Sequence, residues 1–236
     1  MIPPPEAYPA PPPSRNGAFW SYQDLFLLFG LILTTIFILP FVMVLFRQTP
    51  PAYLNLAGQS IIYAVALGAM AAIFRLKYDQ PLWPSLAWRR PLLYNAVVSF
   101  FMGGVVVIGL SYLAALMEAK PHDLPFEKMM INPTLVVLYG IVVVVAGPIC
   151  EELVFRGFIM PVLMRSTGIV LGILITAVLF GALHSFEYAD WRIVLMVTIA
   201  GATFGWRRYT TGSTIDAALM HAGFNLVPFI VLITSR

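Results

Sequence analysis

Seven apolar blocks that follow one another along the chain constrain its fold more than any other feature of the sequence. Each is close to the roughly 20 residues that a helix needs to cross the hydrocarbon core of a bilayer. Because lipid cannot hydrogen-bond an exposed backbone, helix is the conformation open to such segments. The sequence therefore predicts an all-α, polytopic transmembrane helical bundle of about seven to eight spans. The blocks cover residues 25–46, 54–74, 92–117, 134–150, 169–186, 191–206 and 213–233.

The composition supports a membrane protein and argues against a nucleic-acid partner. The chain is 60% hydrophobic and 11% charged, whereas soluble domains are about half apolar and about a quarter charged. The formal net charge is only +3, and no motif for phosphate or base recognition is present. The lipid bilayer is the expected environment, and we expect an integral protein of a bacterial plasma membrane.

The segments outside the blocks predict the domain organisation and the topology. Residues 1–24 form a proline-rich tail for which we expect a disordered or polyproline conformation, and residues 25–236 form the transmembrane domain. Nine of the 14 basic residues lie in connections on the N-terminal side of the bundle and five on the other side. Cytoplasmic loops are enriched in Lys and Arg, so the N-terminus is expected in the cytoplasm.

Three short groups of polar residues interrupt the apolar blocks. A charged side chain inside a membrane span costs about 2.5–3.5 kcal/mol, so such residues are functional candidates. The groups are Glu151, Glu152 and Arg156; Phe180 and His184; and His221 and Asn225.

The first group separates two carboxylates. Glu152 and Arg156 are four residues apart and face each other on a helix, so Arg156 can keep Glu152 ionised. Glu151 is rotated by about 100° and has no partner in its own helix, which leaves it available as a general base. The alternative is that residues 151–156 mark the end of the fourth span at the water interface.

The other two groups carry imidazole and amide side chains. His184 ends an apolar block, where a hydrogen-bonded interface residue is the alternative interpretation. His221 and Asn225 are four apart on one face of the last block, where a hydrogen-bonded clamp between helices is the alternative.

The chain can bring these groups to one depth if residues 148–165 continue as helix past Pro148 and residues 166–168 reverse the chain. Glu152 then lies about 20 Å before the reversal and His184 about 22 Å after it, while His221 lies about 12 Å into the last block. We therefore expect an intramembrane polar cavity. This arrangement makes 134–165 one long, kinked or bent helix.

In this order the groups resemble the CPBP family of intramembrane peptidases, which includes type II CAAX prenyl endopeptidases and the bacteriocin-processing or immunity proteins of the ABI family. The family pattern is Glu-Glu-x-x-x-Arg, then Phe-x-x-x-His, then His-x-x-x-Asn. The resemblance covers about 134–230, the CAAX-protease-like core. It is carried by Glu151, Glu152, Arg156, Phe180, His184, His221 and Asn225.

The resemblance implies a membrane-embedded endopeptidase whose catalytic residues are Glu151, His184, His221 and Asn225. Glu151 would activate water, His184 would help to hold that water, and His221 with Asn225 would stabilise the oxyanion. The supporting residues would be Glu152, Arg156 and Phe180. The expected partner is a peptide or protein substrate, either free or membrane-anchored or lipidated.

Zinc is the alternative cofactor, because two imidazoles and a carboxylate are also a catalytic zinc site with an open water position. Its ligands would be Glu151, His184 and His221, which would make the protein a metalloendopeptidase. The sequence lacks a His-Glu-x-x-His helix, and we favour a glutamate-activated water.

Two functions without proteolysis use the same residues. One is a non-catalytic immunity or partner-binding membrane protein that retains the motif. The other is a proton-coupled transporter, since buried Glu and His can relay protons; no repeated pair of broken helices supports it.

Overall fold

The structure is a computed structural model of the chain, and it describes residues 18–119, 132–185, 188 and 190–235. All regular structure in these residues is helical, which confirms the predicted all-α fold. The proline cluster of the expected tail lies outside the described residues, and so do four basic residues that entered the topology prediction: Arg15, Lys120, Lys128 and Arg236.

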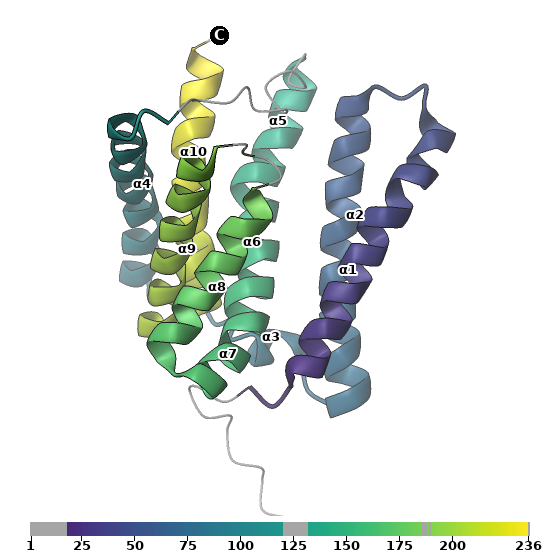
Figure 1. Cartoon of the computed structure of the whole chain (residues 1–236), viewed down its shortest axis with the longest axis vertical. Coiled ribbons are helices and arrows are strands. Elements are labelled where there is room, and N and C mark those ends of the chain that lie inside the picture. The colour runs from purple at the N-terminus through teal and green to yellow at the C-terminus, as the bar shows by residue number, and fades with distance from the viewer. Residues whose placement is uncertain (1–17, 120–131, 186–187, 189, 236) are drawn as a thin grey trace, which may run out of the picture.

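The long helices run up and down along one axis (Figure 1). Helix α10 packs against α4 and α9, α8 packs against α7 and α9, and the α1–α2 hairpin stands to one side, where α2 contacts α5 and α6. Short 3-10 or π-helical segments are labelled η. The elements are α1 (Tyr22–Met43), η1 (Val44–Phe46), α2 (Pro51–Ala72), η2 (Ile73–Lys77), α3 (Leu82–Ser85), α4 (Leu93–Leu116), α5 (Pro133–Ile141), η4 (Val142–Ala146), α6 (Gly147–Glu152), η5 (Leu153–Ile159), α7 (Met160–Thr167), α8 (Ile169–His184), α9 (Trp191–Thr211) and α10 (Thr214–Thr234).

Each of the seven predicted apolar blocks falls on a long helical stretch. Within the described residues, five stretches are long and apolar enough to cross a membrane by themselves. Helix α8 is apolar but shorter, and α9 is less apolar than the other long helices. Both are packed among their neighbours, α9 against α4, α8 and α10. The five stretches are Tyr22–Phe46, Pro51–Lys77, Leu93–Leu116, Pro133–Thr167 and Thr214–Thr234.

The fourth span is one continuous helix of 35 residues, Pro133–Thr167. The block predicted at 134–150 was therefore too short, and the predicted continuation of the helix past Pro148 is confirmed. The predicted reversal is also confirmed, because Gly168 alone separates α7 from α8. Gly168 has a φ of 86°, a backbone conformation that glycine adopts without steric strain.

Two π-helical segments, η4 and η5, allow this helix to contain prolines. Proline has no N–H, and its ring crowds the carbonyl four residues earlier. Each π segment ends two residues before a proline, Pro148 or Pro161. The wider turn shifts the backbone bonding: Gly147 N–H donates to Val142 O, five residues earlier.

The wider turns also leave carbonyl groups for side chains from other helices. Asn225 Nδ2 donates to Val143 O at 2.8 Å, and Trp20 Nε1 donates to Phe158 O at 2.9 Å. Since a buried carbonyl without a partner is costly, these bonds tie α10 and the start of α1 to the fourth span.

A close crossing of α4 and α10 requires glycine on both helices. A Cβ added at Gly103 would overlap the backbone of Met220, and one added at Gly223 would overlap the backbone of Phe100. Small residues at such crossings allow helix backbones to approach, which favours association in lipid.

We expect Gly103→Ala to destabilise the bundle by about 1–3 kcal/mol, the usual cost of overpacking. The matched control is Gly109→Ala on the same helix, where a Cβ meets open space and alanine favours helix. Thermal unfolding of both variants in detergent measures the difference. Equal stability of the two variants would show that the crossing is not tight.

Candidate active site

The two adjacent glutamates on α6 have different surroundings. Glu152 is fully buried and pairs with Arg156 Nη1 at 2.7 Å, as the four-residue spacing predicted. The side chain of Glu151 is 23% exposed and forms no ion pair with Arg156 in the described structure. The separation follows from the 100° rotation between successive helical residues, and it leaves only Glu151 open to a substrate.

Arg156 is held on several sides besides Glu152. Its Nη2 donates to Gly201 O on α9 at 2.7 Å, and its guanidinium lies 4.6 Å from the ring centre of Phe180 and 5.5 Å from that of Phe204. A Cβ at Gly201 would lie 3.1 Å from Nη2, closer than ordinary packing allows. The aromatic faces stabilise a cation that is completely removed from solvent.

His221, on α10, connects the two glutamates. Its Nδ1 lies 3.0 Å from Glu152 Oε1, its ring stacks on Phe204 with centroids 4.7 Å apart, and its Nε2 lies 4.0 Å from Glu151 Oε2. An ionised carboxylate only accepts hydrogen bonds, so the bond to Glu152 places a proton on Nδ1 and directs Nε2 toward Glu151.

His184 contacts the site through Phe180. Its Nδ1 bonds to Phe180 O, one turn earlier on α8, at 2.8 Å. The Phe180 ring lies 4.5 Å from the His184 ring and 5.7 Å from the His221 ring. Among the described residues, no hydrogen bond or ion pair joins His184 to either glutamate. The structure thus places both imidazoles against one aromatic ring, with His184 farther from the carboxylates.

Asn225 lies one turn after His221 on the same helix, and its Nδ2 donates to Val143 O in η4. This bond uses one of the two amide protons, since the side-chain amide has two N–H donors. The π-helical turn in η4 supplies the acceptor and fixes the side chain beside the helix that carries Glu151.

Tyr63 is a site residue that sequence reasoning missed. Its hydroxyl, on α2, donates to Glu151 Oε1 at 3.0 Å. Gly147 allows this approach, because a Cβ there would lie 3.1 Å from the Tyr63 oxygen. The first three blocks contain no motif that predicts a site, although a tyrosine inside the second block is a polar group that needs a partner.

A metal site would require ligands that converge on one point. Within the described part of the chain, no group of three or more His, Cys, Asp or Glu side chains is placed to hold a metal ion. In this structure Glu151, His184 and His221 are thus not gathered into such a group, and zinc stays an alternative for the site. Nδ1 of each histidine is bonded within the protein, which leaves Nε2 as the ring nitrogen available to a ligand.

Comparison with known proteins finds one similarity, which lies in the second half of the chain. Residues 133–227 match a family model described as type II CAAX prenyl endopeptidase Rce1-like. The matched segment contains every candidate residue from Glu151 to Asn225, whereas Tyr63 lies before it. No curated protein and no solved structure matched the chain. Residues 133–227 of this membrane protein are thus similar to the Rce1-like family of type II CAAX prenyl endopeptidases.

Proposed function

We propose that the protein is an intramembrane endopeptidase in which Glu151 activates a water molecule for attack on a peptide bond. The observation that carries this proposal is the 4.0 Å separation of Glu151 Oε2 from His221 Nε2. That distance is too long for a direct hydrogen bond and suits one water bound to both groups. Glu151 would take a proton from this water as the general base.

His221 and Asn225 would then stabilise the oxyanion of the tetrahedral intermediate. After attack by the water, the negative charge forms on the former carbonyl oxygen, where fixed N–H donors in a water-poor site are most effective. Asn225 has a second amide N–H for this role, and His221 would donate from Nε2 in its imidazolium form, in which both ring nitrogens carry a proton. The buried pair of Glu152 and Arg156 would orient His221 through Nδ1. His184, in contact with Phe180, would hold the water or the substrate on the opposite side.

No step of this scheme requires a metal ion. Zinc held by Glu151, His184 and His221 would bind Nε2 of each imidazole, and Nδ1 of each could keep its present partner. Metal analysis of the active sample decides between the two schemes.

The family match and the position of the site support a proposal for the substrate class. We propose a peptide that is membrane-anchored or lipidated, because the site lies among transmembrane helices. Incubating the purified chain in detergent with a peptide library, followed by mass spectrometry, tests this. Discrete cleavage products are expected. A folded chain that yields none with free or lipidated peptides would favour a non-catalytic, partner-binding protein.

The orientation is also a proposal. Arg156, counted among the basic residues of the predicted cytoplasmic connections, is buried inside the bundle instead. The other described basic residues of those connections lie at the end of the bundle where α1 begins and α9 ends, so we propose that this end faces the cytoplasm. A cysteine placed at Asp79 in a Cys150→Ala chain should react with an impermeant thiol reagent only from the cytoplasmic side; reaction from outside would reverse the topology.

We expect Tyr63→Phe to lower kcat about tenfold, with little change in KM. The lost hydroxyl removes a hydrogen bond that positions Glu151, and such a bond to a charged group contributes about 1.5–3 kcal/mol. Tyr112→Phe is the control, because Tyr112 is exposed on α4. Steady-state cleavage of one peptide by both variants measures the effect. An unchanged kcat for Tyr63→Phe would show that the bond to Glu151 does not matter for the reaction.

A further inference from the structure

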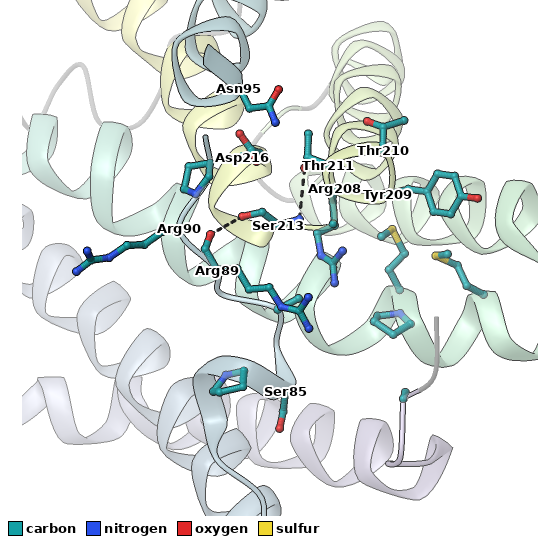
Figure 2. Close-up of a pocket in the computed structure, with 18 of the residues that line it drawn as sticks. Ser85, Arg89, Arg90, Asn95, Arg208, Tyr209, Thr210, Thr211, Ser213 and Asp216 are labelled. Carbon is teal, nitrogen blue, oxygen red and sulfur yellow. Dashed lines mark hydrogen bonds between the residues drawn. The ribbon is translucent and has the colours of Figure 1, made fainter. Parts of the chain in front are cut away.

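A cavity of about 540 Å³ opens at the end of the bundle where α9 ends and α10 begins. Its walls come from the connection between α3 and α4, from the start of α7, and from the turn between α9 and α10 (Figure 2). None of the candidate catalytic residues lines it. The cavity is therefore separate from the candidate active site.

Two arginines converge in this cavity. Figure 2 shows the guanidinium groups of Arg89 and Arg208 directed toward each other, and they are close enough for the charge of Arg89 to act on Arg208. In the described ranges, no carboxylate forms an ion pair with either one. Two like charges that share a cavity repel each other, and an anion between them would offset that repulsion.

The carboxylate that lines the cavity does not neutralise this charge. Asp216 is buried, and its Oδ1 accepts a hydrogen bond from Ser99 on α4 at 3.0 Å. Ser99 also accepts a bond from Arg207 Nε at 2.8 Å. Asp216 thus belongs to a polar network between α4, α9 and α10, apart from the two converging guanidinium groups.

The loop that carries Arg89 is fixed in place by the start of α10. Ser213 Oγ donates to Arg89 O at 2.7 Å, Thr214 N donates to Ala87 O at 3.0 Å, and Thr214 Oγ1 donates to Leu86 O at 2.6 Å. Arg208 Nε donates to the same Thr214 hydroxyl at 2.9 Å. The backbone that positions both arginines is therefore preorganised, which lowers the entropic cost of binding.

The surroundings of the cavity are those of a membrane interface. Trp83 and Trp88 pack together beside it, with ring centroids 6.1 Å apart, and such aromatic residues favour the headgroup level of a bilayer. Leu92, at the cavity wall, is 74% exposed, and the adjacent Leu93 is 81% exposed. A lipid chain could lie along this apolar start of α4 while its headgroup enters the cavity.

We propose that Arg89 and Arg208 bind a phosphate group, supplied by the headgroup of an anionic phospholipid or by free phosphate. The guanidinium groups donate charge-assisted hydrogen bonds to the phosphate oxygens. The site is independent of the proteolytic reaction, so its test does not depend on any activity.

Binding is measured on the full chain, wild type and variants, with two probes. Native mass spectrometry of protein from nanodiscs that contain phosphatidylglycerol and phosphatidylcholine counts retained lipid, and thermal unfolding in detergent measures stabilisation by phosphatidylglycerol or by inorganic phosphate. Arg89→Gln should weaken anion binding about fivefold, as expected for one basic residue at an anionic surface. Arg90→Gln is the matched control: it removes the same charge, and Figure 2 shows Arg90 directed away from the pair.

The two probes distinguish the sources. Retention and stabilisation by phosphatidylglycerol that Arg89→Gln reduces and Arg90→Gln leaves intact support a lipid headgroup. Stabilisation by inorganic phosphate alone, with the same dependence on Arg89, supports a soluble phosphate. An equal effect of the two substitutions, or no response to either probe, would overturn the proposal.

Discussion

Glu151→Gln is expected to lower kcat for peptide cleavage by a factor of about 10²–10⁴, the range that general-base catalysis contributes. Glutamine has nearly the same shape, and its oxygen can still accept the hydrogen bond from Tyr63. It cannot take a proton from water at neutral pH. The fold should therefore survive while the reaction stops, and kcat measured on a cleaved library peptide reports the loss.

The control for this prediction is Glu118→Gln. Glu118 is exposed at the end of α4, so this variant loses the same charge outside the site and should keep full activity. Both variants should unfold at the wild-type temperature. Wild-type turnover by Glu151→Gln would exclude Glu151 as the general base. The buried polar residues around it would then have only a structural role.

Arg156→Met is expected to destabilise the protein by about 3–5 kcal/mol, because it leaves the Glu152 carboxylate buried without its cation. The Arg156 side chain is fully buried, so water cannot replace the lost partner. Thermal unfolding in detergent measures the loss. The double variant Glu152→Gln with Arg156→Met should recover much of this stability, since no uncompensated charge remains.

The chain contains a matched control for the buried pair. Arg75 and Asp79 are also four residues apart and form an ion pair, but their side chains are 75% and 83% exposed. Arg75→Met should leave stability unchanged, because exposed ion pairs contribute little. If Arg156→Met proved equally neutral, Glu152 would not be a buried, ionised carboxylate, and the proposed orientation of His221 would lose its basis.

The sequence predicted the helices well because lipid restricts what an apolar segment can do. Each block became a helix, and the spacing of Glu152 and Arg156 predicted their pairing. The reversal at Gly168 was also predictable, because glycine follows a helix end there. Such features depend on the local spacing of residues and on the surrounding solvent, and both can be inferred from the sequence of apolar and polar residues.

Features that depend on contacts between distant segments were not predictable. The sequence contains Pro148 and Pro161 but does not indicate that π-helical turns would accommodate them, nor that Asn225 would bind a carbonyl released by one. Tyr63 was missed because nothing in the second block indicates which glutamate it will meet. The role of His184 beside the reacting water stays a prediction, and its contact with Phe180 and the bond of its Nδ1 to its own helix were not foreseen.

The most direct test of the central claim is peptide cleavage in ¹⁸O-labelled water by chelator-treated protein whose metal content is measured on the same sample. A water activated by Glu151 predicts that metal-free wild-type protein still cleaves, places one ¹⁸O atom in each new carboxyl group, and loses this reaction in Glu151→Gln. Activity that disappears with the metal and returns with zinc would contradict the account.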